Sequence, residues 1–289
     1  MGMHRDSSLT TAGCTPALRQ PIITVDGARK VYSFGGRELV VFENLSLEVE
    51  KQSFLSIVGP SGCGKSTLLK LISGLELPTA GRVCFNGSPI SGPPKGMIYV
   101  FQQYTKSIFP WRTVIQNIEF GLSSNTDLDR KRARERCREY IRIVGLEGYE
   151  DCYPYQLSGG MQQRVCIARA LICDPDVLLM DEPFSAVDAM TRAILQELVL
   201  KIWSTLPITV LFVTHDVDEA VFLSKRIISL GRAPTGIKEN MEVDLPYPRD
   251  PVMTREDKRF INLRQQLFSG IFVQEKSAAA AAANHASVG

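Results

Sequence analysis

Residues 59–66 read Gly59-Pro60-Ser61-Gly62-Cys63-Gly64-Lys65-Ser66, which fits the pattern GxxxxGK[ST] at every fixed position. The apolar, strand-sized run Phe54 to Val58 precedes this stretch, and Ser66 to Ile72 after it has a helical apolar face that Gly74 can end. Strand, glycine-rich turn and helix in this order predict a phosphate-binding loop. Its backbone N–H groups would hold phosphate oxygens, Lys65 would neutralise the β and γ phosphates, and the Ser66 hydroxyl would ligate Mg²⁺.

A second candidate site lies at Val177-Leu178-Leu179-Met180-Asp181-Glu182, an apolar strand that ends in two adjacent acids. Open α/β sheets bind their ligands at the carboxyl ends of their strands. We expect Asp181 to hold Mg²⁺, directly or through water. Consecutive side chains of an extended segment diverge, so Glu182 can face an attacking water as general base. An acidic pair alone would more often be a solvated turn, and it is the upstream phosphate loop that favours the functional interpretation.

Length and composition indicate a folded globular protein. The chain has 289 residues, of which 44% are hydrophobic and 22% charged, so it allows one large domain or two modest ones. The formal charge of +2 gives no indication of a nucleic-acid partner, and none is expected. No apolar run is long enough for a membrane-spanning helix. The seven cysteines show no CxxC spacing and are expected to be reduced, mostly as small core residues.

The hydrophobic pattern divides the chain into segments. Short β-rich runs between Ile22 and Val58, broken at Gly35-Gly36, predict an antiparallel β subdomain. Residues 103–157 have helical periodicity and predict a mostly helical insertion, whose charged stretch we interpret as a solvated helix face. The continuous apolar runs Val177 to Met180 and Ile208 to Val213 are typical of parallel strands, so the core is α/β. We expect a flexible leader at 1–20, a domain containing the phosphate loop at 21–250, a helical extension at 251–276 and a disordered Ala-rich tail at 277–289.

A third motif indicates which class of phosphate-loop protein the chain is similar to. Leu157-Ser158-Gly159-Gly160-Met161-Gln162-Gln163-Arg164 lies between the two sites and resembles the LSGGQ signature of the nucleotide-binding subunits of ABC transporters, with Met161 in place of Gln. The resemblance runs from about Ile22 to about Asp250. It implies a P-loop NTPase core of ABC type with an antiparallel β subdomain and a helical subdomain. It also implies ATP and Mg²⁺ as cofactors and a head-to-tail dimer, in which Ser158, Gly159 and Gly160 of one copy face the ATP of the other.

Other positions match the family one at a time. Tyr32 matches the aromatic residue that stacks on adenine, although a tyrosine there is more often core and Phe34 is a possible substitute. Gln102 matches the glutamine that reaches Mg²⁺ and the attacking water; taken alone it would be a surface amide. Asp188 in Ser185-Ala186-Val187-Asp188 would contact the partner subunit. His215 matches the switch histidine that bonds the γ phosphate, although a lone histidine at a strand end is usually structural.

These matches give three groups of expected site residues. The catalytic group is Glu182, His215 and Gln102, and the metal group is Ser66, Gln102 and Asp181. The nucleotide-binding group comprises Tyr32, Gly59, Pro60, Ser61, Gly62, Cys63, Gly64, Lys65, Ser66, Thr67, Ser158, Gly159, Gly160 and Asp188.

The chain resembles the nitrate, sulfonate and taurine importer group within this family. Asp181-Glu182-Pro183-Phe184-Ser185, Phe109-Pro110-Trp111 and the closing Pro246-Tyr247-Pro248-Arg249-Asp250 carry that likeness. The group implies a separate integral permease, met by Phe109 and Trp111 unless these pack in the core, and an extracytoplasmic solute-binding protein that acts indirectly. It also implies a peripheral position on the cytoplasmic face of the membrane and a small, anionic or zwitterionic solute. A soluble ABC ATPase of DNA repair or of ribosomes is the alternative; a P-loop kinase or GTPase would lack the signature.

Overall fold

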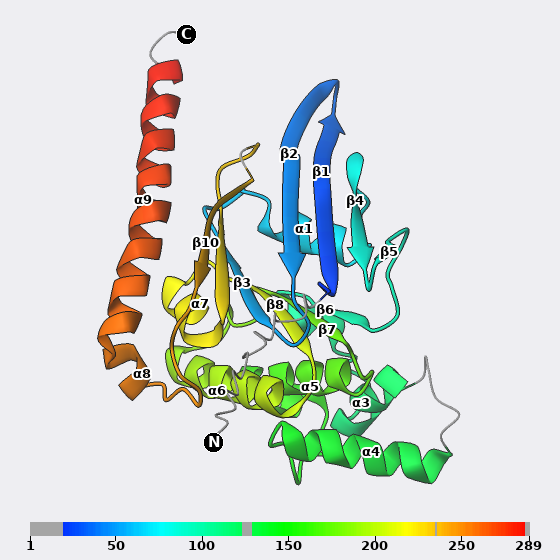
Figure 1. The fold of residues 1–289 in the computed structure, drawn as a ribbon. Helices are drawn as coiled ribbons and strands as arrows, with labels where there is room; N and C mark the ends of the chain where they lie inside the picture. The colour runs from blue at the N-terminus through cyan, green and yellow to red at the C-terminus, as the bar shows by residue number, and fades with distance from the viewer. Residues whose placement is uncertain (1–19, 123–128, 235, 287–289) are drawn as a thin grey trace, which may run out of the picture.

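The chain folds around two sheets with helices on both sides of the larger one (Figure 1). The structure is a computed structural model that describes residues 20–122, 129–234 and 236–286. The leader expected at 1–20 lies outside the described residues except for Gln20. In the part of the chain that is described, no helix is both long and apolar enough to span a membrane.

The larger sheet is mostly parallel and has six strands in the order β10-β9-β3-β8-β7-β6. These strands are β3 (Phe54–Val58), β6 (Met97–Val100), β7 (Val177–Asp181), β8 (Thr209–Val213), β9 (Arg226–Leu230) and β10 (Ile237–Glu242). Among the strands that the described residues form in this sheet, β10 at the edge pairs antiparallel and every other neighbouring pair is parallel. All residues of β3, β7 and β8 are buried, which explains why their sequences are continuous apolar runs rather than alternating ones. The α/β core predicted from the sequence is confirmed.

The smaller sheet is antiparallel, with the order β2-β1-β4-β5. It consists of β1 (Ile23–Phe34), β2 (Arg37–Val49), β4 (Ala80–Phe85) and β5 (Ser88–Pro89). Gly35 and Gly36 form the β1–β2 turn with φ of 55° and 79°, a conformation that glycine adopts without steric cost. The expected antiparallel β subdomain is therefore present, with longer strands than the short runs predicted.

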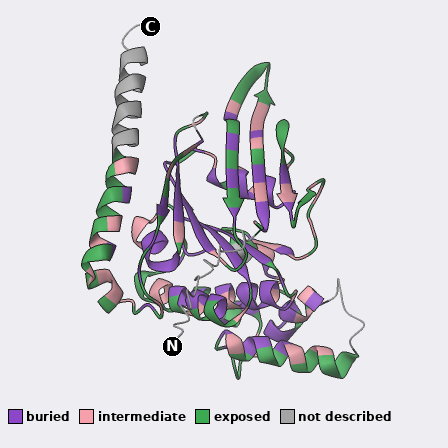
Figure 2. Cartoon of the chain, in the orientation of Figure 1, coloured by how far each residue is buried: buried purple, intermediate pink, exposed green. Residues whose placement is uncertain are grey.

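Both faces of the larger sheet are covered by other elements. On one face, α1 (Lys65–Ile72) and the antiparallel sheet pack on Leu55, Ile57 and Leu179. On the other face, Phe54, Leu178 and Met180 join a core with α5 (Gly159–Leu171), α6 (Ala189–Thr205) and α7 (Val217–Leu223). Figure 2 shows the buried residues concentrated in the sheet and in these helices.

The helical insertion contains α2 (Tyr104–Ser107), α3 (Val114–Leu122), α4 (Arg130–Ile143) and the 3₁₀ turn η1 (Pro154–Gln156). Asp129 caps α4 by accepting a 2.9 Å hydrogen bond from the backbone N–H of Arg132. Cys137, Tyr140 and Ile141 of α4 are buried, whereas most of its basic residues are exposed. The charged stretch is thus a solvated helix face, as expected.

The C-terminal extension forms α8 (Met253–Glu256) and α9 (Lys258–Ala286), and α9 packs against α7. Phe260 and Leu267 anchor α9 because their side chains are fully buried. The prediction of a disordered tail at 277–289 is not met between residues 277 and 286, where α9 continues to Ala286. Alanine has the highest helix propensity, so a run of six can extend a helix that tertiary packing has already nucleated. Residues 287–289 lie outside the described residues.

Candidate functional site

The phosphate-binding loop joins the carboxyl end of β3 to the first turn of α1. Gly59, Gly62 and Gly64 have φ of 150°, 77° and 101°, which side-chain-bearing residues rarely adopt. A Cβ on Gly64 would lie 2.6 Å from Val41 Cγ1, and one on Gly59 would lie 2.7 Å from the Leu230 carbonyl oxygen. All three glycines therefore suit the turn, and Gly59 and Gly64 are also needed for its close packing. Gly64 is the N-cap of α1 and makes no side-chain cap hydrogen bond, as an anion-binding helix start requires.

Two side chains of the loop point inward. Lys65 is only 7% exposed, and its Nζ donates to the carbonyl oxygens of Gly59 at 2.8 Å and Pro60 at 3.1 Å. The ammonium group is thereby held across the loop. The side chain of Cys63 is buried beneath it, and this burial raises the pKa of the thiol. Cys63 is thus a packing residue of the loop; its backbone is what the loop offers to a phosphate.

The metal-binding group predicted from the sequence is partly assembled. Ser66 Oγ donates a 3.0 Å hydrogen bond to Asp181 Oδ1, which brings the start of α1 to the end of β7. Asp181 Oδ2 accepts a second hydrogen bond, of 2.9 Å, from the hydroxyl of Tyr99. A hydroxyl and one carboxylate suit Mg²⁺, which takes oxygen ligands and completes its shell with substrate phosphates and water. The donors present therefore fit this ion.

Glu182 is where the expected catalytic residues meet. Its Oε2 lies 3.1 Å from His215 Nδ1 and accepts a 3.2 Å hydrogen bond from Gln102 Nε2. The structure thus places the Gln102 side chain on Glu182. Glu182 has φ of 43°, a left-handed conformation that costs energy for a residue with a side chain, and its N–H donates to the Val213 carbonyl at 2.9 Å. This backbone turn directs Glu182 away from the strand axis that Asp181 follows.

One cavity unites the phosphate loop with two distant segments. Its lining includes Gly62, Lys65, Ser66 and Thr67 from the loop region, Tyr32 from β1 and Glu182 from the end of β7. The Tyr32 hydroxyl hydrogen-bonds Glu76, and Lys30 Nζ lies 4.8 Å from the centre of its ring. Partial burial and the Glu76 carboxylate raise the pKa of Tyr32. The ring is thus held at the mouth of the cavity; Phe34, the alternative, is 67% exposed and stacks on Tyr32.

The signature residues lie elsewhere. Ser158 caps α5 by accepting a hydrogen bond of 3.3 Å from the Met161 N–H. Gly160 packs so closely on α6 that an added Cβ would lie 2.3 Å from Thr191 Cγ2. Among the described residues that line the cavity of Tyr32 and Lys65, none is Ser158, Gly159 or Gly160. The structure therefore brings the phosphate loop, Asp181, Glu182, Gln102 and His215 together, but not the signature.

Asp188 has a local role in addition to the one expected. Its carboxylate caps α6, with Oδ1 accepting from the N–H groups of Met190 at 3.1 Å and Thr191 at 3.0 Å. Oδ2 accepts from the Thr191 hydroxyl at 2.7 Å. These bonds, led by those from Thr191, lower the pKa of Asp188. The residue is exposed, so contact with a partner subunit stays a prediction.

Tyr99 is a site residue that the sequence analysis missed. It pairs in register with Leu179, which lies two residues before Asp181 on β7, so the side chains of these three residues share one face of the sheet. The signal was therefore present as a tyrosine in an otherwise apolar edge strand, but only the strand pairing reveals its partner. Burial, followed by the Asp181 carboxylate, raises the pKa of Tyr99, which keeps its hydroxyl protonated as a donor.

Comparison with known proteins shows the family to which the chain belongs. The family model described as "ABC transporter" matches residues 42–185. An ABC transporter ATP-binding protein of Methanocaldococcus jannaschii, itself uncharacterised, is 48% identical over 86% of this chain and 90% of its own. An aliphatic sulfonates import ATP-binding protein of Bacillus cereus is 46% identical over 78% of this chain and 88% of its own. The solved dimeric structure of a bacterial ABC transporter cassette superimposes with a TM-score of 0.68 at 31% identity, over 78% of this chain and all of that one. The chain therefore belongs to the family of ABC transporter ATP-binding proteins.

Proposed function

We propose that this chain binds ATP with Mg²⁺, hydrolyses it, and thereby energises import of a small anionic solute through a separate permease. One observation carries the proposal: the phosphate loop and Glu182 line one cavity, with Ser66 hydrogen-bonded to Asp181 beside them. An NTP site needs a phosphate cradle, a metal group and a water-activating group in one place.

Each residue has a defined task in this reaction. The glycine-rich loop and Lys65 bind the β and γ phosphates. Ser66 and Asp181 would hold Mg²⁺, which when bound would supply positive charge to offset that of the phosphates. Glu182 accepts a proton from the attacking water, and Gln102 and His215 orient its Oε2 from either side. Tyr32 supplies an aromatic face for the adenine ring.

A second copy of the chain completes the site. Ser158, Gly159 and Gly160 start a helix that presents N–H groups, but they do not line the cavity of their own chain. A head-to-tail dimer puts this helix start on the γ phosphate bound by the other copy, with Asp188 at the contact. A related cassette, 30% identical with a TM-score of 0.67, was solved as a dimer in a post-hydrolysis state with ADP and Pi.

Phe109 and Trp111 form an aromatic cluster in the helical insertion, and this cluster is the surface that we propose contacts the permease. Trp111 is 70% exposed, and its ring centre lies 5.6 Å from that of Phe109. The guanidinium groups of Arg112 and Arg169 lie over the Phe109 ring at 5.3 and 5.4 Å. An exposed aromatic cluster rimmed by arginines suits a protein contact. It would hold the chain peripherally at the cytoplasmic face of the membrane.

The solute is assigned by class. Several relatives at 41–46% identity are named for import of aliphatic sulfonates. We therefore propose a sulfonate or similarly small anion, selected by an extracytoplasmic binding protein and by the permease rather than by this chain.

Affinity capture of the tagged chain from detergent-solubilised membranes of its host, followed by mass spectrometry, tests the partnership. We expect a polytopic permease to co-purify, and its accompanying binding protein to bind alkanesulfonates in calorimetric titration. A Trp111→Ser variant should lose the permease, whereas Tyr149→Ser, which removes another exposed aromatic residue of the insertion, should keep it. Recovery of soluble proteins, ribosomes or DNA alone would overturn the transport proposal and favour a soluble ABC ATPase.

A further inference from the structure

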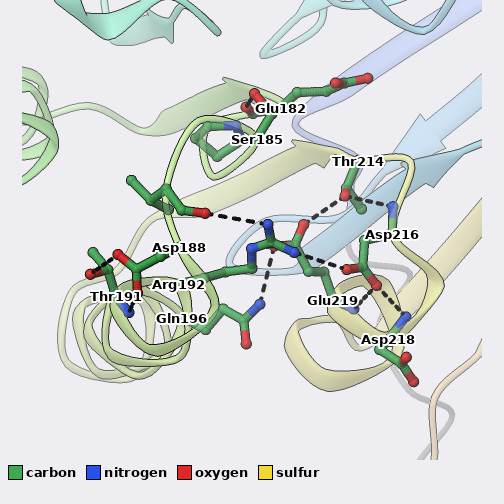
Figure 3. A network of polar contacts seen from close by, with 12 residues as sticks. Glu182, Ser185, Asp188, Thr191, Arg192, Gln196, Thr214, Asp216, Asp218 and Glu219 are labelled. Atoms are coloured by element: carbon green, nitrogen blue, oxygen red, sulfur yellow. Dashed lines mark hydrogen bonds and ion pairs between the residues drawn. The ribbon is translucent and has the colours of Figure 1, made fainter. Parts of the chain in front are cut away.

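Arg192, in the first turn of α6, touches two loops that approach Glu182 from different parts of the chain (Figure 3). Its Nη2 donates to the Val187 carbonyl at 3.4 Å, in the turn that leads from Glu182 to Asp188. Its Nη1 donates to Asp216 Oδ2, also at 3.4 Å, immediately after His215. Its Nε lies 3.8 Å from Glu219 Oε1. One guanidinium group therefore bridges the turn 183–188 and the segment 214–216.

Glu219 ties the same segment from inside the protein. This carboxylate is only 5% exposed and accepts hydrogen bonds from Thr214 Oγ1 at 2.6 Å and Gln196 Nε2 at 3.1 Å. Thr214 Oγ1 also accepts from the N–H of Asp216 at 3.0 Å. Thr214, before His215, thus bonds the carboxylate that Arg192 contacts, and Asp216, after His215, bonds Thr214. A buried carboxylate needs a nearby cation and hydrogen bonds to stay charged, and Arg192 is the cation paired with it.

These contacts close a ring around the catalytic glutamate. A tight turn leads from Glu182 to Val187. Within this turn, Ser185 Oγ donates a 3.0 Å hydrogen bond to the Glu182 carbonyl oxygen. Arg192 connects Val187 to Asp216, and His215 returns to Glu182 Oε2 at 3.1 Å. His215 itself is 63% exposed, so its position depends on its neighbours in the chain rather than on packing.

We propose that Arg192 is a positioning residue that holds the turn 183–188 and the switch segment Thr214–Asp216 in register, so that His215 stays on Glu182. Arg192 is absent from the lining of the nucleotide cavity, so it acts through these loops and not on the phosphates. Its planar fork reaches a carbonyl and a carboxylate at once, which a lysine ammonium on a flexible stem does not reproduce. The proposal rests on the roles proposed above for Glu182 and His215.

The test compares Arg192→Gln and Arg192→Lys with Arg82→Gln, which removes an exposed ion pair with Asp26 on the antiparallel sheet. We expect both Arg192 variants to keep the KM for ATP within about twofold while kcat falls about tenfold to a hundredfold, because misplaced catalytic groups cost rate rather than binding. Arg82→Gln should match the wild type. Unchanged kcat in both Arg192 variants, or a loss confined to KM, would overturn the proposal.

A double-mutant cycle with His215→Ala separates this role from general damage. If Arg192 acts through His215, then Arg192→Gln should lower kcat by less than about twofold in the His215→Ala background. Full multiplication of the two losses would overturn the proposal while leaving the role of His215 intact. Wild-type activity in His215→Ala would instead contradict the proposed function and the inference with it. Arg192→Lys keeps the charge beside Glu219, so it guards against a variant that fails to fold.

Discussion

The hydroxyl of Tyr99 donates a 2.9 Å hydrogen bond to Asp181 Oδ2, while Ser66 bonds the other oxygen of the same carboxylate. Tyr99 lies on β6 and Asp181 at the end of β7, so the bond crosses two neighbouring parallel strands. Groups that orient a metal-binding carboxylate affect metal affinity without touching the ion. We therefore expect Tyr99 to orient the Asp181 carboxylate for the Mg²⁺ proposed to bind there.

Replacing Tyr99 with Phe removes only this bond. We expect the Mg²⁺ concentration for half-maximal ATPase activity to rise about tenfold, with little change in kcat at saturating Mg²⁺. The free energy of unfolding should fall by about 1.5–3 kcal/mol, because a hydrogen bond to a carboxylate is lost. Magnesium titrations and urea unfolding measure the two effects. Tyr149→Phe, at an exposed tyrosine, is the control; equal Mg²⁺ dependence in both variants would contradict the role given to Tyr99.

Glu182→Gln tests the proton acceptor. The amide keeps the size of the side chain and a partner for Gln102, but it does not accept a proton from water. We expect kcat to fall at least about a hundredfold, with ATP affinity unchanged and an ATP-dependent dimer that persists in gel filtration. Glu197→Gln changes an exposed glutamate on α6 and should leave turnover intact. Near-native hydrolysis by Glu182→Gln would remove this residue from the base role.

The sequence was sufficient wherever function depends on contiguous residues. The local sequence is enough to predict three features, because each needs particular residue types at consecutive positions. They are the phosphate loop, the strand that ends at Asp181 and the turn at Gly35-Gly36. Strand ends also converge in any parallel sheet, which is why Glu182 and His215 could be expected near one another.

Contacts between elements distant in sequence could not be predicted in this way. The Tyr99 bond depends on which strand neighbours β7, and the bridge from Arg192 to Asp216 depends on how α6 packs beside α7. The tail differs for another reason. Low sequence complexity predicts disorder, whereas alanines that follow a docked helix continue it as far as Ala286.

Glu219 makes stability depend on pH. Burial raises the pKa of this carboxyl above its ordinary value of 4.5, and nearby Asp216 adds to the rise, while Thr214, Gln196 and Arg192 partly offset it. Above pH 4.5 the unfolded chain ionises more readily than the folded one, so this group's contribution to stability is lost as pH rises through the folded-state pKa.

Glu219→Gln should remove the loss of stability that ionisation of Glu219 causes as pH rises. Relative to the wild type, the free energy of unfolding of the variant should increase with pH, by at most about 1.4 kcal/mol per pH unit between the two pKa values. Urea unfolding at a series of pH values measures the difference, and Glu197→Gln should show no such trend. A variant whose relative stability falls with pH would mean that the pairing with Arg192 outweighs burial.

Gly160 of the signature packs against Thr191 of α6. An added Cβ on Gly160 would lie 2.3 Å from Thr191 Cγ2, so Gly160→Ala must displace either the Thr191 side chain or the start of α5. Alanine in a helix gains about 1 kcal/mol over glycine, but overpacking costs about 1–3 kcal/mol. We expect a net loss of unfolding free energy in Gly160→Ala, measured by urea unfolding.

Thr191→Ser provides the rescue, because serine lacks the obstructing methyl group and keeps the hydroxyl that donates to Asp188 Oδ2 at 2.7 Å. The double variant Gly160→Ala/Thr191→Ser should therefore regain most of the lost stability, although Thr191→Ser alone gains nothing. Gly92→Ala is the matched control, since a Cβ there meets nothing within 4 Å. If Gly160→Ala were as stable as Gly92→Ala, or if serine gave no rescue, the contact between α5 and α6 would not be what requires glycine at position 160.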